Sequence, residues 1–212
     1  MTPAARNGAP TGEVPALAPV LRELRWWDLD AVLELERALF PEDAWSPGMF
    51  WSELAYARGP RANRRYVVAE AAGRLVGYGG LAAVDGTGDI QTIATARDQW
   101  GTGLGARLLT ELLSAATAFE CREVLLEVRV DNVRAQRLYE RFGFEPIGFR
   151  RGYYQPGNVD ALVMRRTGTD PDTDPDSDPD PDPDADVDPA GATGAPPGST
   201  APTAPSDSVQ GT

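Results

Sequence analysis

A glycine-rich segment between a strand and a long amphipathic helix constrains the fold of this chain more than any other feature. Residues 99–106 are Gln-Trp-Gly-Thr-Gly-Leu-Gly-Ala. Apolar residues then recur with the period of a helix that buries one face, at 104, 108, 109, 112, 113, 116 and 119. Backbone N–H groups at a helix N-terminus, with glycines that allow close approach, favour a phosphate or pyrophosphate site. An ordinary glycine-rich turn is the alternative, but the glycine content exceeds what a turn requires.

The spacing of these glycines limits the classes of ligand that the site is expected to bind. It is G-x-G-x-G and not the G-x-G-x-x-G of dinucleotide-binding folds, and the strands before it are expected to be antiparallel. We therefore expect a different phosphate-bearing cofactor.

The rest of the domain alternates between strand and helix patterns. Strands are expected at 20–25, 65–70, 75–84, 89–95, 124–130, 144–149 and 160–165. Helices are expected at 27–39, 46–54, 104–119 and 132–142, with Ser46 as an N-cap and Pro47 in the first turn. The three strands after the second helix form an antiparallel meander in this interpretation, which gives an α/β (α+β) fold.

Charge and composition divide the chain into three parts. Of the 32 acidic residues, eleven are Asp residues at 167–212, whereas residues 1–166 hold all 20 Arg and 21 acidic residues. The C-terminal part is built of Asp-Pro repeats followed by Ala, Pro, Gly, Ser and Thr, and residues 1–19 are rich in Ala, Pro and Gly. Such segments have little to bury. We expect a flexible lead at 1–19, a folded domain at 20–166 and a disordered acidic tail at 167–212, which either solubilises the chain or attracts a basic partner.

Missing residue types exclude several kinds of chemistry. The chain has no His and no Lys, which excludes a His general base, a His-based metal site and a Walker-type phosphate loop. Cys121 is the only cysteine, which excludes an intramolecular disulfide and fits a reducing compartment. No basic run favours nucleic-acid binding, and no apolar run approaches the ~20 residues of a membrane-spanning helix. We expect a cytoplasmic protein that binds no metal, nucleic acid or membrane.

Two segments together resemble the GNAT N-acetyltransferases. One is the loop around Gly103-Leu104-Gly105 with its flanking strand and helix, and the other is Leu-Tyr-Glu-Arg-Phe-Gly-Phe at 138–144. The resemblance covers about residues 20–166. It implies the GNAT fold, a mixed, mostly antiparallel sheet of about six or seven strands flanked by about four helices, with parallel central strands splayed around acetyl-CoA.

The same resemblance implies a set of cofactor-binding residues. The loop amides would hold the pyrophosphate of CoA, the backbone of the preceding strand would pair with the pantetheine arm, and an Asn that opens the later helix would contact the cofactor. By position these residues are Gly101, Thr102, Gly103, Leu104, Gly105, Ala106, Ile93, Ala94, Thr95 and Asn132. The chain departs from the family at Trp100, where Gln or Arg is usual, and this leaves the pyrophosphate without one commonly polar neighbour.

More specifically, the residues around Glu127 and Tyr139 resemble those of the ribosomal-protein-alanine N-acetyltransferases. In that group the Glu is the proton acceptor and the Tyr twelve residues later is the proton donor. Acetyl transfer itself asks for such a pair: an α-amine of pKa about 7.7–8.0 must be neutral to attack, and the leaving thiolate, of thiol pKa about 8.5, must be protonated. Taken singly, a solvated strand charge and an aromatic at the edge of the core are the commoner roles of these residues.

The segment 151–158 resembles the loop that protein N-terminal acetyltransferases fold over the backbone of their peptide substrate. Tyr153 and Tyr154 would hydrogen-bond peptide groups and exclude water. Phe40 and Trp45, between the first two helices, would form the opposite wall. A plain hairpin with two exposed tyrosines is the alternative.

Taken together, these features predict an acetyl-CoA-dependent N-alpha-acetyltransferase that acts on a protein N-terminus, with the N-terminal Ala of a small-subunit ribosomal protein as the expected acceptor. Cys121 lies between Glu120 and Arg122 and is expected to be structural, so the amine should attack directly in a ternary complex. One alternative is the same fold acting on a small amine or a Lys side chain. Another is an acyl-CoA-binding module without catalytic activity.

Overall fold

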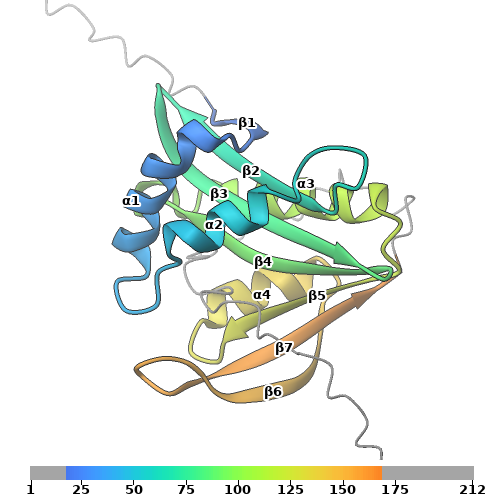
Figure 1. Ribbon diagram of the computed structural model, residues 1–212. Coiled ribbons are helices and arrows are strands. Elements are labelled where there is room, and N and C mark those ends of the chain that lie inside the picture. Colours follow the sequence, from blue (N-terminus) through green and yellow to red (C-terminus); the bar gives the residue numbers. More distant parts are fainter. Residues whose placement is uncertain (1–17, 169–212) are drawn as a thin grey trace, which may run out of the picture.

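A single twisted sheet with helices on both faces forms the body of the protein in a computed structural model that describes residues 18–168 (Figure 1). The strands are β1 (Val20–Glu23), β2 (Arg64–Ala71), β3 (Arg74–Val84), β4 (Thr87–Thr95), β5 (Glu123–Arg129), β6 (Glu145–Tyr154) and β7 (Val159–Thr167). The helices are α1 (Leu29–Leu39), α2 (Pro47–Leu54), α3 (Leu104–Ala118) and α4 (Val133–Arg141), with short 3-10 helices at Trp26–Asp28 and Arg97–Gln99. The expected lead and tail fall outside the described residues except at their inner ends.

The strands are ordered β1-β2-β3-β4-β5-β7-β6 across the sheet. All neighbouring strands are antiparallel except β4 and β5, which are parallel. Figure 1 shows α1 and α2 in front of the sheet and α3 and α4 behind it. The expected mixed, mostly antiparallel sheet with four flanking helices is confirmed.

Each face of the sheet has its own hydrophobic core. The core on the α3 and α4 face includes Ile90, Leu108, Leu126, Val128 and Tyr139. The core on the α1 and α2 face includes Val32, Trp45, Phe50, Tyr66 and Tyr78. Because side chains of a strand alternate between faces, core membership fixes the face on which their neighbours lie.

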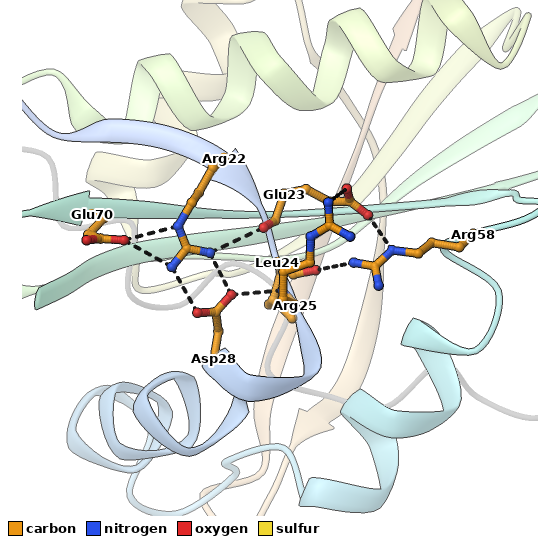
Figure 2. Close-up of polar contacts among 7 residues, drawn as sticks. All are labelled: Arg22, Glu23, Leu24, Arg25, Asp28, Arg58 and Glu70. Atoms are coloured by element: carbon orange, nitrogen blue, oxygen red, sulfur yellow. Dashed lines mark hydrogen bonds and ion pairs between the residues drawn. The ribbon is translucent and has the colours of Figure 1, made fainter. Parts of the chain in front are cut away.

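An ion-pair network attaches β1 and the start of α1 to the sheet edge (Figure 2). The guanidinium of Arg22 donates two hydrogen bonds to Asp28, of 2.7 and 2.9 Å, and one to Glu70 on β2. Burial by itself would raise the pKa of Asp28, but the hydrogen bond from Arg22 holds that pKa below its usual range. The network fixes the position from which α1 crosses the sheet.

Element boundaries differ from the sequence expectation by one or two residues in most elements and by more at the end of β6. The residues before α1 form a separate 3-10 turn at Trp26–Asp28 in place of the first helical residues. Strand β6 continues to Tyr154 instead of ending near Phe149. By contrast, the Ser46 N-cap of α2 is confirmed, since its Oγ accepts a hydrogen bond from the N–H of Met49.

Candidate active site

The glycine-rich loop between β4 and α3 has a backbone that favours glycine at two positions. Gly101 and Gly103 have φ angles of 76° and 80°. Gly103 is the N-cap of α3, and a Cβ added there would meet no atom within 4 Å, so the backbone conformation and not packing explains the glycine. The first N–H groups of α3, from Leu104 to Ala106, have no acceptor within the helix. This geometry suits the anion site that the sequence predicts.

The two parallel strands next to this loop pair over only part of their length. Their register runs from Thr87 opposite Glu123 to Ile90 opposite Leu126, and both strands continue beyond it. Ile93, Ala94 and Thr95 lie in that further part of β4, where they pair with β3 on the other side. The part of β4 predicted to pair with the pantetheine arm therefore lies beyond its pairing with β5.

Glu127 lies on the part of β5 beyond this pairing. Its neighbours Leu126 and Val128 belong to the core under α3 and α4, so the carboxylate is on the α1 and α2 face. The residue is 8% exposed, and Oε1 lies 3.0 Å from Nη2 of Arg150 on β6. Burial raises the pKa of the Glu127 carboxyl and Arg150 counteracts this effect. A partly desolvated, more basic carboxylate is suited to accept a proton.

A second carboxylate, Asp89 on β4, was not predicted from the sequence. It lies on the same face as Glu127, because the next residue, Ile90, belongs to the opposite core. Burial, and then the charge of Glu127, raise the pKa of Asp89 to about 7. The signal available in the sequence was an Asp in the middle of a strand, where this residue type is rare. Arg150 also went unnoticed, because nothing local marks it as the partner of Glu127.

Tyr139 lies on α4 and is completely buried in the core under α3 and α4. Its Oη has no hydrogen-bond partner among residues 18–168. Burial, with a smaller effect of Tyr154, raises the pKa of the phenol well above its usual range, so the hydroxyl keeps its proton. A buried hydroxyl without a partner is costly, and a ligand that accepts its hydrogen bond would remove this cost.

The β6–β7 hairpin brings its two tyrosines next to Glu127. The Tyr154 hydroxyl is 3.4 Å from the backbone carbonyl of Glu127, and the Tyr153 ring packs at right angles to that of Tyr154 with centroids 5.2 Å apart. Burial, and then Glu127, raise the pKa of Tyr153 to about 12. Tyr154 is buried and Tyr153 half-buried, which excludes the alternative of two exposed tyrosines.

The predicted opposite wall, Phe40 and Trp45, is packed into the core under α1 and α2. The two residues are 6% and 2% exposed, and Trp45 contacts Phe50 with ring centroids 5.2 Å apart. The backbone N–H of Trp45 donates to Oε1 of Glu36, a carboxylate that is fully buried. These side chains hold the loop between α1 and α2 in place, and their contact with a peptide stays a prediction.

The sequence that carries this site matches a known protein family. Residues 29–144 match the model of the Acetyltransferase (GNAT) family. The chain belongs to the GNAT family. It is 40% identical over 149 residues to the N-alpha-acetyltransferase RimI of Mycobacterium tuberculosis, an alignment that covers 68% of this chain and 89% of that protein.

Solved GNAT structures share the fold. The crystal structure of the ribosomal-protein-S18-alanine N-acetyltransferase from Escherichia coli superposes with a TM-score of 0.61 at 26% identity, over 70% of this chain and 93% of that one. A complex of Arabidopsis thaliana Naa50 with the bisubstrate analogue CoA-Ac-MVNAL gives a TM-score of 0.61 at 21% identity, over 72% and 100% of the two chains, and supports the fold alone. The protein is therefore a GNAT N-acetyltransferase that uses acetyl-CoA, and its resemblance to the ribosomal-protein-alanine group is confirmed.

Several observations on this GNAT chain fit a bound acetyl-CoA. The loop offers free helix N-terminal amides, β4 extends beyond its parallel partner, and the Tyr139 hydroxyl lacks an acceptor among the described residues. Asn132 is the N-cap of α4, with Oδ1 accepting from the N–H of Ala135, so its predicted cofactor contact would add to a structural role. Cys121 is buried and burial raises its thiol pKa, which disfavours the thiolate that a covalent acetyl-enzyme requires.

Within residues 18–168, no cluster of three or more acidic, Cys or His side chains is arranged to hold a metal ion. In the same part of the chain, no helix has the length and apolar character needed to cross a membrane.

The buried carboxyl of Glu36 should make the stability of this GNAT domain depend on pH. Burial raises the pKa of its carboxyl from 4.5 to about 7. The folded state therefore holds the proton more tightly than the unfolded chain, and this stabilisation, complete below pH 4.5, is lost as the pH rises through 7. The unfolding free energy of the unmodified chain should therefore fall between pH 4.5 and 8. We expect this fall to be smaller in Glu36→Gln by on the order of 3 kcal/mol. The Gln side chain keeps an acceptor for the Trp45 N–H.

Urea denaturation at both pH values tests this, with Glu34→Gln on the exposed side of the same helix as the control. An equal pH dependence in the two variants contradicts the assignment of the raised pKa to Glu36.

Proposed function

We propose that the protein acetylates the α-amine of a protein N-terminus, with the N-terminal Ala of a small-subunit ribosomal protein as the acceptor. The observation that carries the proposal is the β6–β7 hairpin, which places Tyr153 and Tyr154 beside Glu127. The N-alpha-acetyltransferase RimI of Mycobacterium tuberculosis and the ribosomal-protein-S18-alanine N-acetyltransferase of Escherichia coli support the same acceptor class. A ribosomal acceptor also places the enzyme in the cytoplasm.

In this mechanism Glu127 accepts the proton of the acceptor amine, through a water molecule. The α-ammonium has a pKa of about 7.7–8.0, so near neutral pH most of it is charged and unable to attack. Burial makes Glu127 a stronger base than an exposed carboxylate, and the charge of Arg150 opposes this rise in its pKa. Asp89 adds a second acidic group on the same face, which favours a cationic amine there.

Tyr139 acts as the proton donor. Acetyl-CoA supplies an activated thioester, and the amine attacks it directly in a ternary complex. The Tyr139 hydroxyl, buried and without a partner among the described residues, donates its proton to the departing sulfur. Its raised pKa keeps this proton in place across the working pH range.

Replacing Arg150 tests the electrostatics of the proton acceptor. Arg150 lowers the pKa of both Glu127 and Asp89. Because its side chain is 51% exposed, solvent screens part of the effect, and we expect Arg150→Ala to move the acid limb of kcat/KM to higher pH. The exposed neighbour Arg151 provides a matched control, and pH profiles that agree between Arg150→Ala and Arg151→Ala contradict the assignment.

A pair of peptides tests whether the acceptor is an α-amine or a Lys side chain. Two peptides with the same Ala-first sequence and an internal Lys, one with a free and one with a blocked N-terminus, are assayed for CoA release. The proposal predicts turnover of the free peptide only. Equal turnover of both peptides instead supports a Lys side chain as the acceptor.

A further inference from the structure

Two arginines lie over the indole ring of Trp100, directly before the glycine-rich loop. The Cζ atoms of Arg97 and Arg134 are each 5.4 Å from the ring centroid. The indole Nε1 donates a 3.2 Å hydrogen bond to the carbonyl of Thr95, which fixes the ring against the end of β4. The 3-10 helix after β4 and the first turn of α4 thus each bring one cation to the ring of Trp100.

Arg134 has hydrogen-bond donors without acceptors. Its Nε and Nη2 atoms are buried and have no partner among residues 18–168. Leaving such charged donors unpaired is costly. A guanidinium matches the oxygens of a phosphate with paired N–H groups, so the donors of Arg134 indicate an anionic ligand.

Nearby carboxylates do not neutralise this pair within the described part of the chain. Asp98, which follows Arg97, pairs with Arg74, and Asp131, near Arg134, pairs with Arg129. Two guanidinium groups therefore share one neutral ring beside free helix N-terminal amides, and a ligand with several negative charges would be attracted there.

We propose that Arg97 and Arg134, positioned by Trp100, form a cationic clamp for the phosphate groups of CoA. The indole takes the place of the Gln or Arg that is usual at this position and serves as a platform for two cations. The clamp binds the cofactor and takes no part in proton transfer. This inference rests on the use of acetyl-CoA, and the test measures binding without turnover.

Isothermal titration calorimetry of the full chain with CoA tests the clamp. We expect Arg134→Ala to weaken CoA binding by about ten- to a hundredfold, since it removes charge-assisted hydrogen bonds. Arg134→Lys should recover only part of this loss, because an ammonium lacks the planar fork of a guanidinium. Arg37→Ala, which removes the same charge from the exposed side of α1, is the control and should bind CoA as the unmodified chain does.

Titration of the same variants with 3′-dephospho-CoA shows which phosphate group of CoA Arg134 contacts. An equal loss with both ligands places Arg134 on the diphosphate, and a loss seen with CoA alone places it on the 3′-phosphate; either result supports the clamp. CoA affinities that agree between Arg134→Ala and Arg37→Ala, with both variants folded by circular dichroism, overturn it. Absence of CoA binding by the unmodified chain would overturn the acetyl-CoA assignment as well.

Discussion

Tyr139→Phe is expected to lower kcat for acetyl transfer by about 10²- to 10⁴-fold, with CoA affinity and the fold retained. The substitution removes only a hydroxyl that is fully buried and has no hydrogen-bond partner among the described residues. Phe fills the same space and keeps the edge-to-face contact with Phe144, whose ring centroid is 5.9 Å away. Steady-state assays of peptide acetylation measure kcat, and calorimetry of CoA binding measures the affinity separately.

Tyr78 provides a matched control for this experiment. It is also completely buried, with an Oη that lacks a partner in the described part of the chain, but it lies in the core under α1 and α2. Tyr78→Phe should leave kcat within a few-fold of the original value. If Tyr139→Phe is no slower than Tyr78→Phe, Tyr139 is a packing residue and the proton donor is another group.

Glu127→Gln is expected to lower kcat/KM by about 10²- to 10⁴-fold near neutral pH, because the amide cannot accept the amine proton. The deficit should shrink as the pH rises above about 8, where the α-amine loses its proton to solvent without help. The deficit of Tyr139→Phe should not shrink in this way. The pH dependence of kcat/KM for the two variants therefore separates the proton acceptor from the donor.

Glu123→Gln is the corresponding control, since Glu123 lies on the same strand and, four residues away, on the same face. Its activity should change little at any pH. A Glu127→Gln deficit that is constant from pH 6 to 9 argues that Glu127 positions the substrate and does not accept its proton.

Local patterns in the sequence predicted most of the fold. The 3.6-residue spacing of Leu104, Leu108 and Leu112 located α3, and the Ser46-Pro47 pair located the start of α2. The end of β6 was missed, because Arg150-Arg151-Gly152 breaks the apolar alternation. The strand nevertheless continues, since Arg150 pairs with Ala161 and Tyr154 with Val159 of β7.

The candidate site was predictable where its residues lie close together in sequence, and less so where the sheet order brings them together. Glu127 and Tyr139 stand twelve positions apart in a recognisable segment. Arg150 reaches Glu127 only because β7 returns between β5 and β6 in the sheet. Likewise, the sequence indicated only that Trp100 removes a polar neighbour of the pyrophosphate. The tertiary structure shows that its ring contacts the guanidinium groups of Arg97 and Arg134.

Mass spectrometry of acceptor peptides tests the central claim most directly. Peptides that begin with Ala, Ser, Met or Gly, each with one internal Lys, are incubated with the protein and acetyl-CoA, and the modified atom is located by fragmentation. The account predicts acetate on the α-amine, fastest for the Ala-first peptide and absent with Tyr139→Phe. Acetate found only on the Lys side chain, or no acetate although CoA binds, would contradict it.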